Sequence, residues 1–117
     1  MFIKRGAKLV IKVGEALPVL KSLATRHNVK AIFSHYETWN KFSKDRDSVI
    51  RKWTDENSID WKEYQQNGVV RNLNSRDGWS TLWHGHMRKK IYEIPEKIFC
   101  VSEDSDNLPS CQDMSLE

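Results

Sequence analysis

The chain has 117 residues, of which 38% are hydrophobic and 30% are charged. This length suits one domain and does not accommodate a two-domain enzyme. No apolar run approaches the roughly 18 residues of a membrane span, and four basic residues within the first 14 positions are atypical of a secretory signal. We therefore expect a cytoplasmic protein with no membrane partner, or an organellar or nuclear one directed there by a signal that the sequence does not reveal.

The charge is distributed unevenly along the chain. All 19 Lys and Arg lie in residues 1–97, whereas residues 98–117 carry five acidic residues and no basic one. A basic body is compatible with a phosphate-bearing partner and equally with an ordinary solvated surface. Cys100 and Cys111 lie in or beside the acidic stretch, where we expect two reduced thiols rather than a disulfide.

Strands and helices alternate in the first half of the chain. Residues 8–13, KLVIKV, are aliphatic and β-branched, which predicts a buried strand. Residues 15–27 then place leucines at helical spacing, and Asn28 is suited to end that helix. Residues 29–33, VKAIF, repeat the strand pattern and lead into a polar and aromatic loop at 34–43.

A second helix is predicted from Ser43, with Ser43 or Asp45 as its cap. Its inward stripe is Val49, Ile50 and Trp53, and its remaining cations are left for solvent or a partner: Lys44, Arg46, Arg51 and Lys52. Residues 59–64, IDWKEY, alternate apolar and polar side chains, as a strand with one covered face does.

A third helix is predicted from Ser75 or Asp77 to about Lys90. Its apolar side chains share one face, and the tryptophans among them favour core or interface packing: Trp79, Leu82, Trp83 and Met87. After Pro95 the sequence no longer places apolar residues at helical or strand spacing. We therefore divide the chain into an α/β domain at 1–97 and an acidic disordered tail or interdomain linker at 98–117.

The alternation of strand and helix predicts an α/β fold that is Rossmann-like and three-layered, with a parallel sheet and alternating helices. Ligands of such sheets bind beyond the carboxyl ends of the strands, which here are Gly14 and residues 34–43 and 65–73. Trp39 lies in one of these loops, where an indole either stacks on a planar ligand or covers the edge of the core.

Motifs for catalysis and metal binding are missing from the sequence. It contains neither GxGxxG nor GxxxxGK[ST], and no GxSxG elbow. His84 and His86 flank Gly85 without a carboxylate or thiolate beside them, whereas a metal site needs three or four converging ligands. We therefore assign no catalytic residue and no metal ligand.

Two stretches carry a family pattern. Residues 34–53 read SHYETWNKFSKDRDSVIRKW, and residues 59–87 read IDWKEYQQNGVVRNLNSRDGWSTLWHGHM. They resemble the amino-terminal α/β domain of the DNA photolyase and cryptochrome family, and most closely its cryptochrome-like branch. There, a HEETGN loop precedes an Arg-Asp pair, and a QxGVVRxLxxRxGWxxxWxxxM segment follows the next strand. The resemblance covers about residues 8–94.

The resemblance implies an antenna module. In that family this domain holds a folate or deazaflavin antenna near the domain junction, and the candidate cofactor-binding residues here lie in the loop: His35, Glu37, Thr38, Trp39 and Asn40. Tyr36 and Trp39 depart from the pattern, because they replace a carboxylate and a glycine. Trp39 is therefore also expected to fill the chromophore pocket itself.

The resemblance also implies a piece of a larger flavoprotein. The family's domain begins with two further strands, and a separate helical domain holds FAD and the damaged DNA. Neither part has a counterpart here, so we expect a fragment truncated at both ends, whose partner is the missing flavin domain and which alone binds no cofactor and has no activity. An inactive remnant, or a small basic nucleic-acid-binding module using Arg71 and Arg76, remains the alternative.

Overall fold

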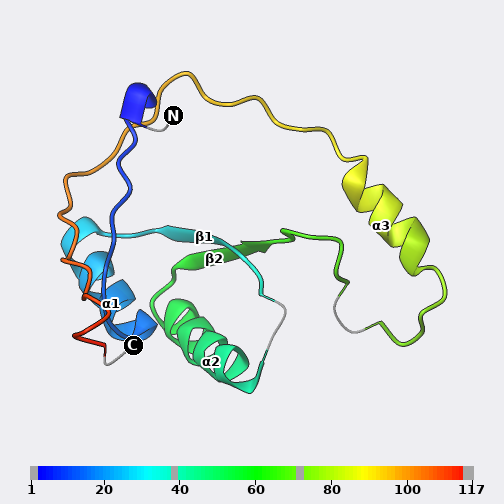
Figure 1. Cartoon of the computed structure of the whole chain (residues 1–117), viewed down its shortest axis with the longest axis horizontal. Coiled ribbons are helices and arrows are strands. Elements are labelled where there is room, and N and C mark those ends of the chain that lie inside the picture. The colour runs from blue at the N-terminus through cyan, green and yellow to red at the C-terminus, as the bar shows by residue number, and fades with distance from the viewer. Residues whose placement is uncertain (1–2, 38–39, 71–72, 115–117) are drawn as a thin grey trace. The chain divides into compact units, whose positions relative to one another are not determined.

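The computed structural model of the chain describes residues 3–37, 40–70 and 73–114. In chain order its elements are a 3-10 turn η1 (Ile3–Arg5), α1 (Ala16–His27), β1 (Ala31–His35), α2 (Lys41–Glu56), β2 (Asp60–Tyr64) and α3 (Trp79–Met87) (Figure 1). These elements belong to two compact units. One comprises residues 1–28 and 94–117, and the other is Val29–Glu93.

The Val29–Glu93 unit is built on a parallel pair of strands. Ala31 lies opposite Asp60 and His35 opposite Tyr64, with α2 connecting the two strands and packing against β2. A parallel pair needs such a crossover, because the chain must return to the same end of the sheet. The expectation of a mixed α/β fold is therefore confirmed, with both strands about one or two residues later than predicted.

The strand predicted at residues 8–13 is wrong. The described sheet has two strands, β1 and β2, and this segment instead contacts residues near the C-terminus. The Ile11 N–H donates to Ser105 Oγ at 3.1 Å, and the Ile11 carbonyl accepts from the Asp106 N–H at 2.8 Å. A β-branched run becomes a strand only where another strand completes its hydrogen-bond ladder. Two strands alone do not make a Rossmann-like three-layer fold.

The helices form where predicted, but the start of α2 and both ends of α3 differ. α2 begins at Lys41 because Asn40, rather than Ser43 or Asp45, is its N-cap: Asn40 Oδ1 accepts from the Ser43 N–H at 2.9 Å. α3 extends only from Trp79 to Met87 and stops before Lys90. The predicted end of α1 is confirmed, since Asn28 has a left-handed conformation with φ of 49°.

The buried core of this unit is small. Among the described residues its buried hydrophobic side chains are Ile50 and Trp53 of α2 and Ile59 just before β2. Thr54 is also fully buried and donates to the Arg51 carbonyl at 2.8 Å. The inward positions expected for Ile50 and Trp53 are confirmed, whereas Val49 is 52% exposed.

The sheet has one covered and one open face, as the alternation in residues 59–64 predicted. Trp61 points toward α2, where the Arg51 guanidinium lies 4.0 Å from its ring centroid. On the other face Phe33 and Tyr64 are 64% and 52% exposed, with their rings stacked 6.4 Å apart. No described helix is long and apolar enough to cross a membrane.

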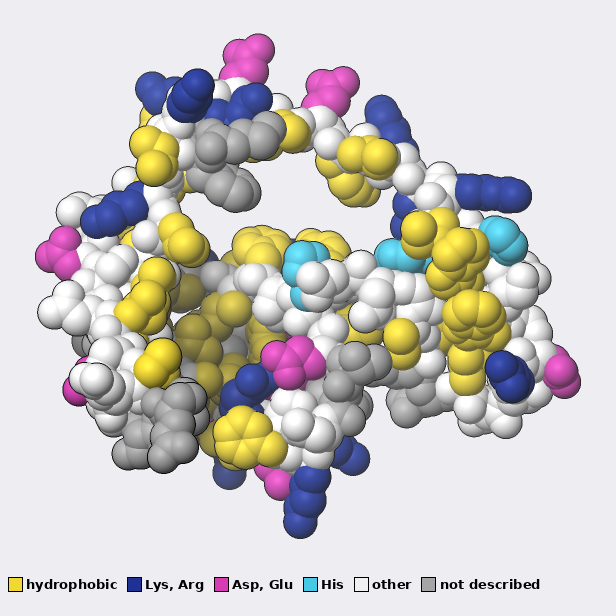
Figure 2. Space-filling model, in the orientation of Figure 1, with side chains coloured by type: hydrophobic (Ala, Val, Ile, Leu, Met, Phe, Trp, Pro, Cys, Tyr) yellow, Lys and Arg dark blue, Asp and Glu magenta, His cyan; other side chains and the backbone are white. Residues whose placement is uncertain are grey.

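α3 contacts the rest of its unit through the loop after β2. The Trp83 indole lies directly against Gly68. The other residues of its apolar stripe are exposed: Trp79, Leu82 and Met87. The core alternative for Trp79 is therefore wrong, and the interface alternative stays a prediction. Figure 2 shows these hydrophobic side chains gathered over α3.

The unit formed by residues 1–28 and 94–117 joins the two ends of the chain. The Ile98 N–H donates to the Arg5 carbonyl at 2.7 Å, and the Arg5 guanidinium donates to the Pro95 carbonyl at 2.6 Å. Further along, Glu103 is buried at 8% exposure. Whether residues 98–117 act as a linker stays a prediction.

Candidate functional site

The candidate site lies where β1 ends and α2 begins. The Tyr36 N–H donates to the Tyr64 carbonyl at 3.1 Å, which extends the β1–β2 ladder by one residue into the loop. The parallel pairing therefore brings Tyr36 and Glu37 to the carboxyl end of the sheet. Thr38 and Trp39 lie outside the described residues, so stacking by Trp39 and blocking of the pocket stay predictions.

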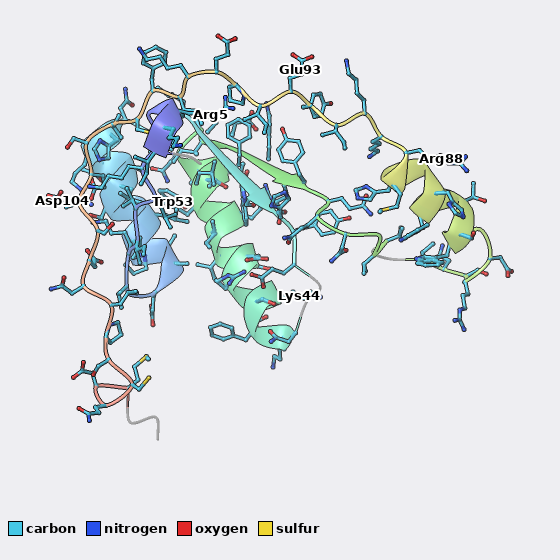
Figure 3. All side chains as sticks on the ribbon, turned by 45° about the horizontal axis from the view of Figure 1, so that its top comes forward. Arg5, Lys44, Trp53, Arg88, Glu93 and Asp104 are labelled. Atoms are coloured by element: carbon cyan, nitrogen blue, oxygen red, sulfur yellow. The ribbon has the colours of Figure 1, made fainter. Side chains whose placement is uncertain are left out.

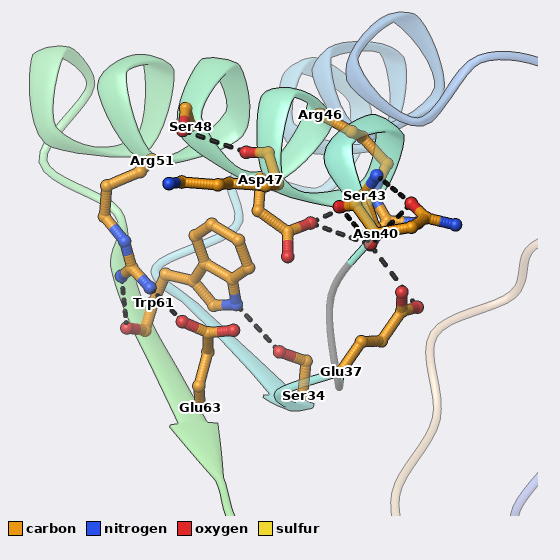
Figure 4. Close-up of polar contacts among 11 residues, drawn as sticks. Ser34, Glu37, Asn40, Ser43, Arg46, Asp47, Ser48, Arg51, Trp61 and Glu63 are labelled. Carbon is orange, nitrogen blue, oxygen red and sulfur yellow. Dashed lines mark hydrogen bonds and ion pairs between the residues drawn. The ribbon is translucent and has the colours of Figure 1, made fainter. Parts of the chain in front are cut away.

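Asn40 and Glu37 both lie at the start of α2 and both have partners within the chain (Figure 4). Asn40 Oδ1 accepts from the Ser43 backbone at 2.9 Å and from the Ser43 hydroxyl at 3.1 Å. The Glu37 carboxylate lies 3.3 Å from the Arg46 guanidinium. The loop is thus tied to the first turns of the helix at two points.

Arg46 is shared between two carboxylates. Its Nε and Nη2 donate to Asp47 Oδ1 at 2.9 and 2.7 Å, and Nη2 also reaches Glu37. Asp47 first, and Glu37 to a smaller extent, raise the pKa of the Arg46 guanidinium. The sequence left Arg46 for solvent or a partner, whereas here it holds the loop to the helix.

His35 differs from the other candidates. It is exposed at the end of β1 and shares the open face of the sheet with Phe33, because side chains two apart on a strand point to the same side. In the register His35 lies opposite Tyr64. The structure therefore brings Glu37 and Asn40 to the start of α2 and leaves His35 on the open face.

Sequence reasoning missed a polar network on the covered face. The Trp61 indole N–H donates to Ser34 Oγ at 2.9 Å, and Arg51 donates to the Trp61 carbonyl at 2.9 Å and to Glu63 Oε2 at 2.5 Å (Figure 4). The alternation in residues 59–64 placed Trp61 and Glu63 on one face. Only the register of β1 and β2 shows that Ser34 meets them.

Next to this network is an open hollow at the end of α2 and the start of β2. Its lining includes Arg51, Thr54, Asp55, Ile59 and Trp61. None of these residues belongs to the candidate loop, and Arg51 is already paired. Among the described residues no group of three or more His, Cys, Asp or Glu side chains is arranged to hold a metal ion.

The loop after β2 packs beside the candidate site. The Tyr36 hydroxyl donates to the Val69 carbonyl at 3.3 Å, and so does the Gln65 side-chain amide. The Val69 N–H in turn donates to Asn67 Oδ1 at 3.0 Å. The two loops that follow the strands are therefore in contact through the Val69 backbone.

Comparison with protein-family models, with curated proteins and with solved structures finds no match for this chain. The resemblance to the photolyase and cryptochrome family therefore stays a hypothesis that rests on the sequence motifs.

Proposed function

We propose that this chain is part of the α/β antenna module of a photolyase- or cryptochrome-type flavoprotein, which acts in light-driven DNA repair or blue-light sensing. The observation that supports this most is the parallel β1–α2–β2 unit, because it puts the motif loop at the carboxyl end of a sheet. Open α/β sheets bind ligands at that end. FAD and damaged DNA belong to a separate helical domain in this proposal.

In this proposal the loop binds a chromophore and carries out no bond chemistry. The Asn40 carbonyl oxygen is used by Ser43, so its amide nitrogen is the group that donates to a ligand. The Glu37 carboxylate is 55% exposed and accepts hydrogen bonds from the polar edge of a folate or deazaflavin ring. Charge-assisted hydrogen bonds of this kind give orientation as well as affinity.

The decisive test is the coding sequence on either side of this segment. We expect an in-frame continuation that encodes the helical flavin domain, and its absence would contradict the proposal. The isolated chain is expected to be colourless and to leave thymine dimers intact under blue light. Flavin absorption with light-dependent loss of dimers would show that the chain is more than an antenna module.

Antenna binding is tested on the longer protein that includes the flavin domain. Titration with a reduced folate and with a deazaflavin, followed by visible absorption, is expected to show saturable binding. Glu37→Gln should weaken it about 10- to 150-fold, since a lost charged hydrogen bond costs about 1.5–3 kcal/mol. Glu56→Gln is the matched control, because Glu56 is an exposed carboxylate at the other end of α2. Equal effects of both substitutions would contradict the role of Glu37.

A basic nucleic-acid-binding module is the second candidate. The observation that favours it is a run of exposed cations after α3: Arg88, which Figure 3 labels, Lys89 and Lys90. None of the three has an ion pair in the described part of the chain. Arg71 lies outside the described residues, and Arg76 is exposed. Phosphate contacts by such residues make affinity fall steeply with salt.

This second candidate is tested by fluorescence anisotropy with labelled single-stranded and duplex oligonucleotides. The logarithm of the binding constant should fall linearly with the logarithm of the salt concentration. Replacing Arg88, Lys89 and Lys90 together by Ala should reduce the magnitude of that slope by up to about three. Lys52→Ala and Lys62→Ala are the controls, since their ammonium groups are already paired with Glu56 and Asp60. A slope that the triple variant leaves unchanged would exclude this surface.

A further inference from the structure

The unit formed by residues 1–28 and 94–117 holds a carboxylate among three basic side chains. Glu103 is only 8% exposed. Lys12 Nζ and Arg26 Nη1 each lie 2.8 Å from its Oε1, and His27 Nε2 lies 2.6 Å from its Oε2. Lys12 comes from the extended segment before α1, and Arg26 and His27 come from the last turn of α1. Two separate parts of the chain thus converge on one anion.

The segment that brings Glu103 there lies along residues 8–13. Lys8 Nζ donates to the Glu103 carbonyl at 3.2 Å. Asp106 accepts from the Val13 N–H at 2.9 Å and from Lys12 Nζ at 3.3 Å. Asp104 lies between Glu103 and Asp106 and is exposed, and it is the residue of this segment that Figure 3 labels. The acidic segment is therefore bound in an extended form, as a peptide ligand would be.

The Glu103 carboxylate is a poor geometric match for the donors around it. Both Lys12 and Arg26 approach Oε1, yet Oε1 has no hydrogen bond of good geometry. A carboxylate has two oxygens in one plane for these three donors, whereas a phosphate presents three or four oxygens in a tetrahedron. The arrangement of donors therefore suits a tetrahedral oxyanion better than the group that now occupies it.

The charge of the cluster points the same way. Hydrogen bonding to His27 first and to Lys12 second lowers the pKa of the Glu103 carboxyl to about 2, and the charges of Arg26 and Lys12 add smaller contributions. The unit as a whole is balanced, because its seven basic residues meet seven acidic ones. Without Glu103, Arg26 and His27 would lose the carboxylate that they contact, and Lys12 would keep Asp106 Oδ1 at 3.3 Å.

We propose that Lys12, Arg26 and His27 form a binding site for a phosphate group and that Glu103 occupies this site as an internal competitor. A phosphate-bearing ligand then displaces the segment at 103–106, and the segment in turn keeps the site closed to weakly bound anions. This inference is independent of the antenna proposal, because it concerns the other unit of the chain.

The test uses the full chain and inorganic phosphate. In Glu103→Gln, the Lys12, Arg26 and His27 side chains lose the Glu103 carboxylate, so isothermal titration should show phosphate binding at least tenfold tighter than in the unchanged chain. The His27 imidazole NMR signals should shift during the same titration. Adding Arg26→Ala to Glu103→Gln should abolish most of this gain.

Asp104→Asn is the matched control, since it removes one negative charge from an exposed neighbouring carboxylate. Equal phosphate affinity in Glu103→Gln and Asp104→Asn would overturn the proposal, as would a gain that survives Arg26→Ala. If Glu103→Gln does not fold, phosphate is titrated into the unchanged chain at constant ionic strength. Movement of the Ile11 and Asp106 amide signals then supports displacement of the segment, and unmoved signals refute it.

Discussion

Gly68 shows how much a single residue contributes to the position of α3. A Cβ at this site would overlap the Trp83 indole, so Gly68→Ala is expected to displace Trp83 and to destabilise the contact by about 1–3 kcal/mol. Tryptophan fluorescence should shift to longer wavelength as the ring enters water.

Gly85→Ala is the matched control for Gly68→Ala. A Cβ at Gly85 meets no atom within 4 Å, and Ala inside a helix is expected to stabilise by about 0.5–1 kcal/mol relative to Gly. An unchanged spectrum in Gly68→Ala would contradict this packing.

Asn40 is the second residue with a measurable structural role. It caps α2 through the Ser43 backbone N–H, and replacing a capping side chain by Ala costs about 1 kcal/mol. We expect Asn40→Ala to lower the urea midpoint and Asn40→Asp to keep it, because an aspartate caps equally well. A midpoint that Asn40→Ala leaves in place would mean that the helix start does not depend on this bond. Loss of chromophore binding in Asn40→Ala must therefore be compared with Asn40→Asp.

At the scale of elements, the contact between the 103–106 segment and α1 depends on pH. The pKa of Glu103 is lowered to about 2 from an ordinary value of 4.5, so its stabilising contribution is complete above about pH 4.5 and is lost as the pH falls toward 2. The groups that face this carboxylate are Lys12, Arg26, His27, Asp106 and, through the backbone, Lys8.

The measurement is the chemical shift of the Ile11 and Asp106 amides during an acid titration. These amides report the contact, and their signals should change between about pH 4.5 and pH 2 in the unchanged chain. Glu103→Gln removes the Glu103 titration and should remove this transition from the Ile11 signal, while Asp104→Asn should retain it. The Asp106 amide also follows its own carboxyl, whose pKa is lowered by the Val13 N–H and by Lys12. A transition that persists in Glu103→Gln would assign the pH dependence to another carboxyl group.

At the scale of the whole molecule, the number of buried apolar side chains limits stability. The buried hydrophobic residues among those described are Ile50, Trp53 and Ile59, all in the Val29–Glu93 unit. Ile50→Ala should cost about 2–5 kcal/mol, which is a large part of the stability of a small domain. Leu82→Ala is the control, because Leu82 is 49% exposed. Urea unfolding followed by circular dichroism is expected to separate the two variants, and similar midpoints would contradict a core centred on α2.

The amino-acid sequence by itself determined the elements whose cause is local. Leucines at helical spacing and Asn28 define α1, and the alternation in residues 59–64 defines a strand with one covered face. The helical stripe also identified Ile50 and Trp53 as buried. Each of these follows from side-chain periodicity or from a preference of one residue for a turn, and needs no distant partner.

Tertiary contacts decided the remainder. Residues 8–13 have the composition of a strand, yet Ile11 of this segment bonds to Ser105 and Asp106. A strand forms only where a second strand accepts and donates its backbone hydrogen bonds, and composition does not determine whether such a strand lies beside it. Arg46 and Arg51 look alike in sequence as surface cations, but the fold gives one to Glu37 and Asp47 and the other to Trp61 and Glu63. Lys12 and Glu103 are separated by most of the chain in sequence, yet they form an ion pair. Opposite charges attract strongly only at short distance, so this pair depends on the folded chain bringing the two side chains together.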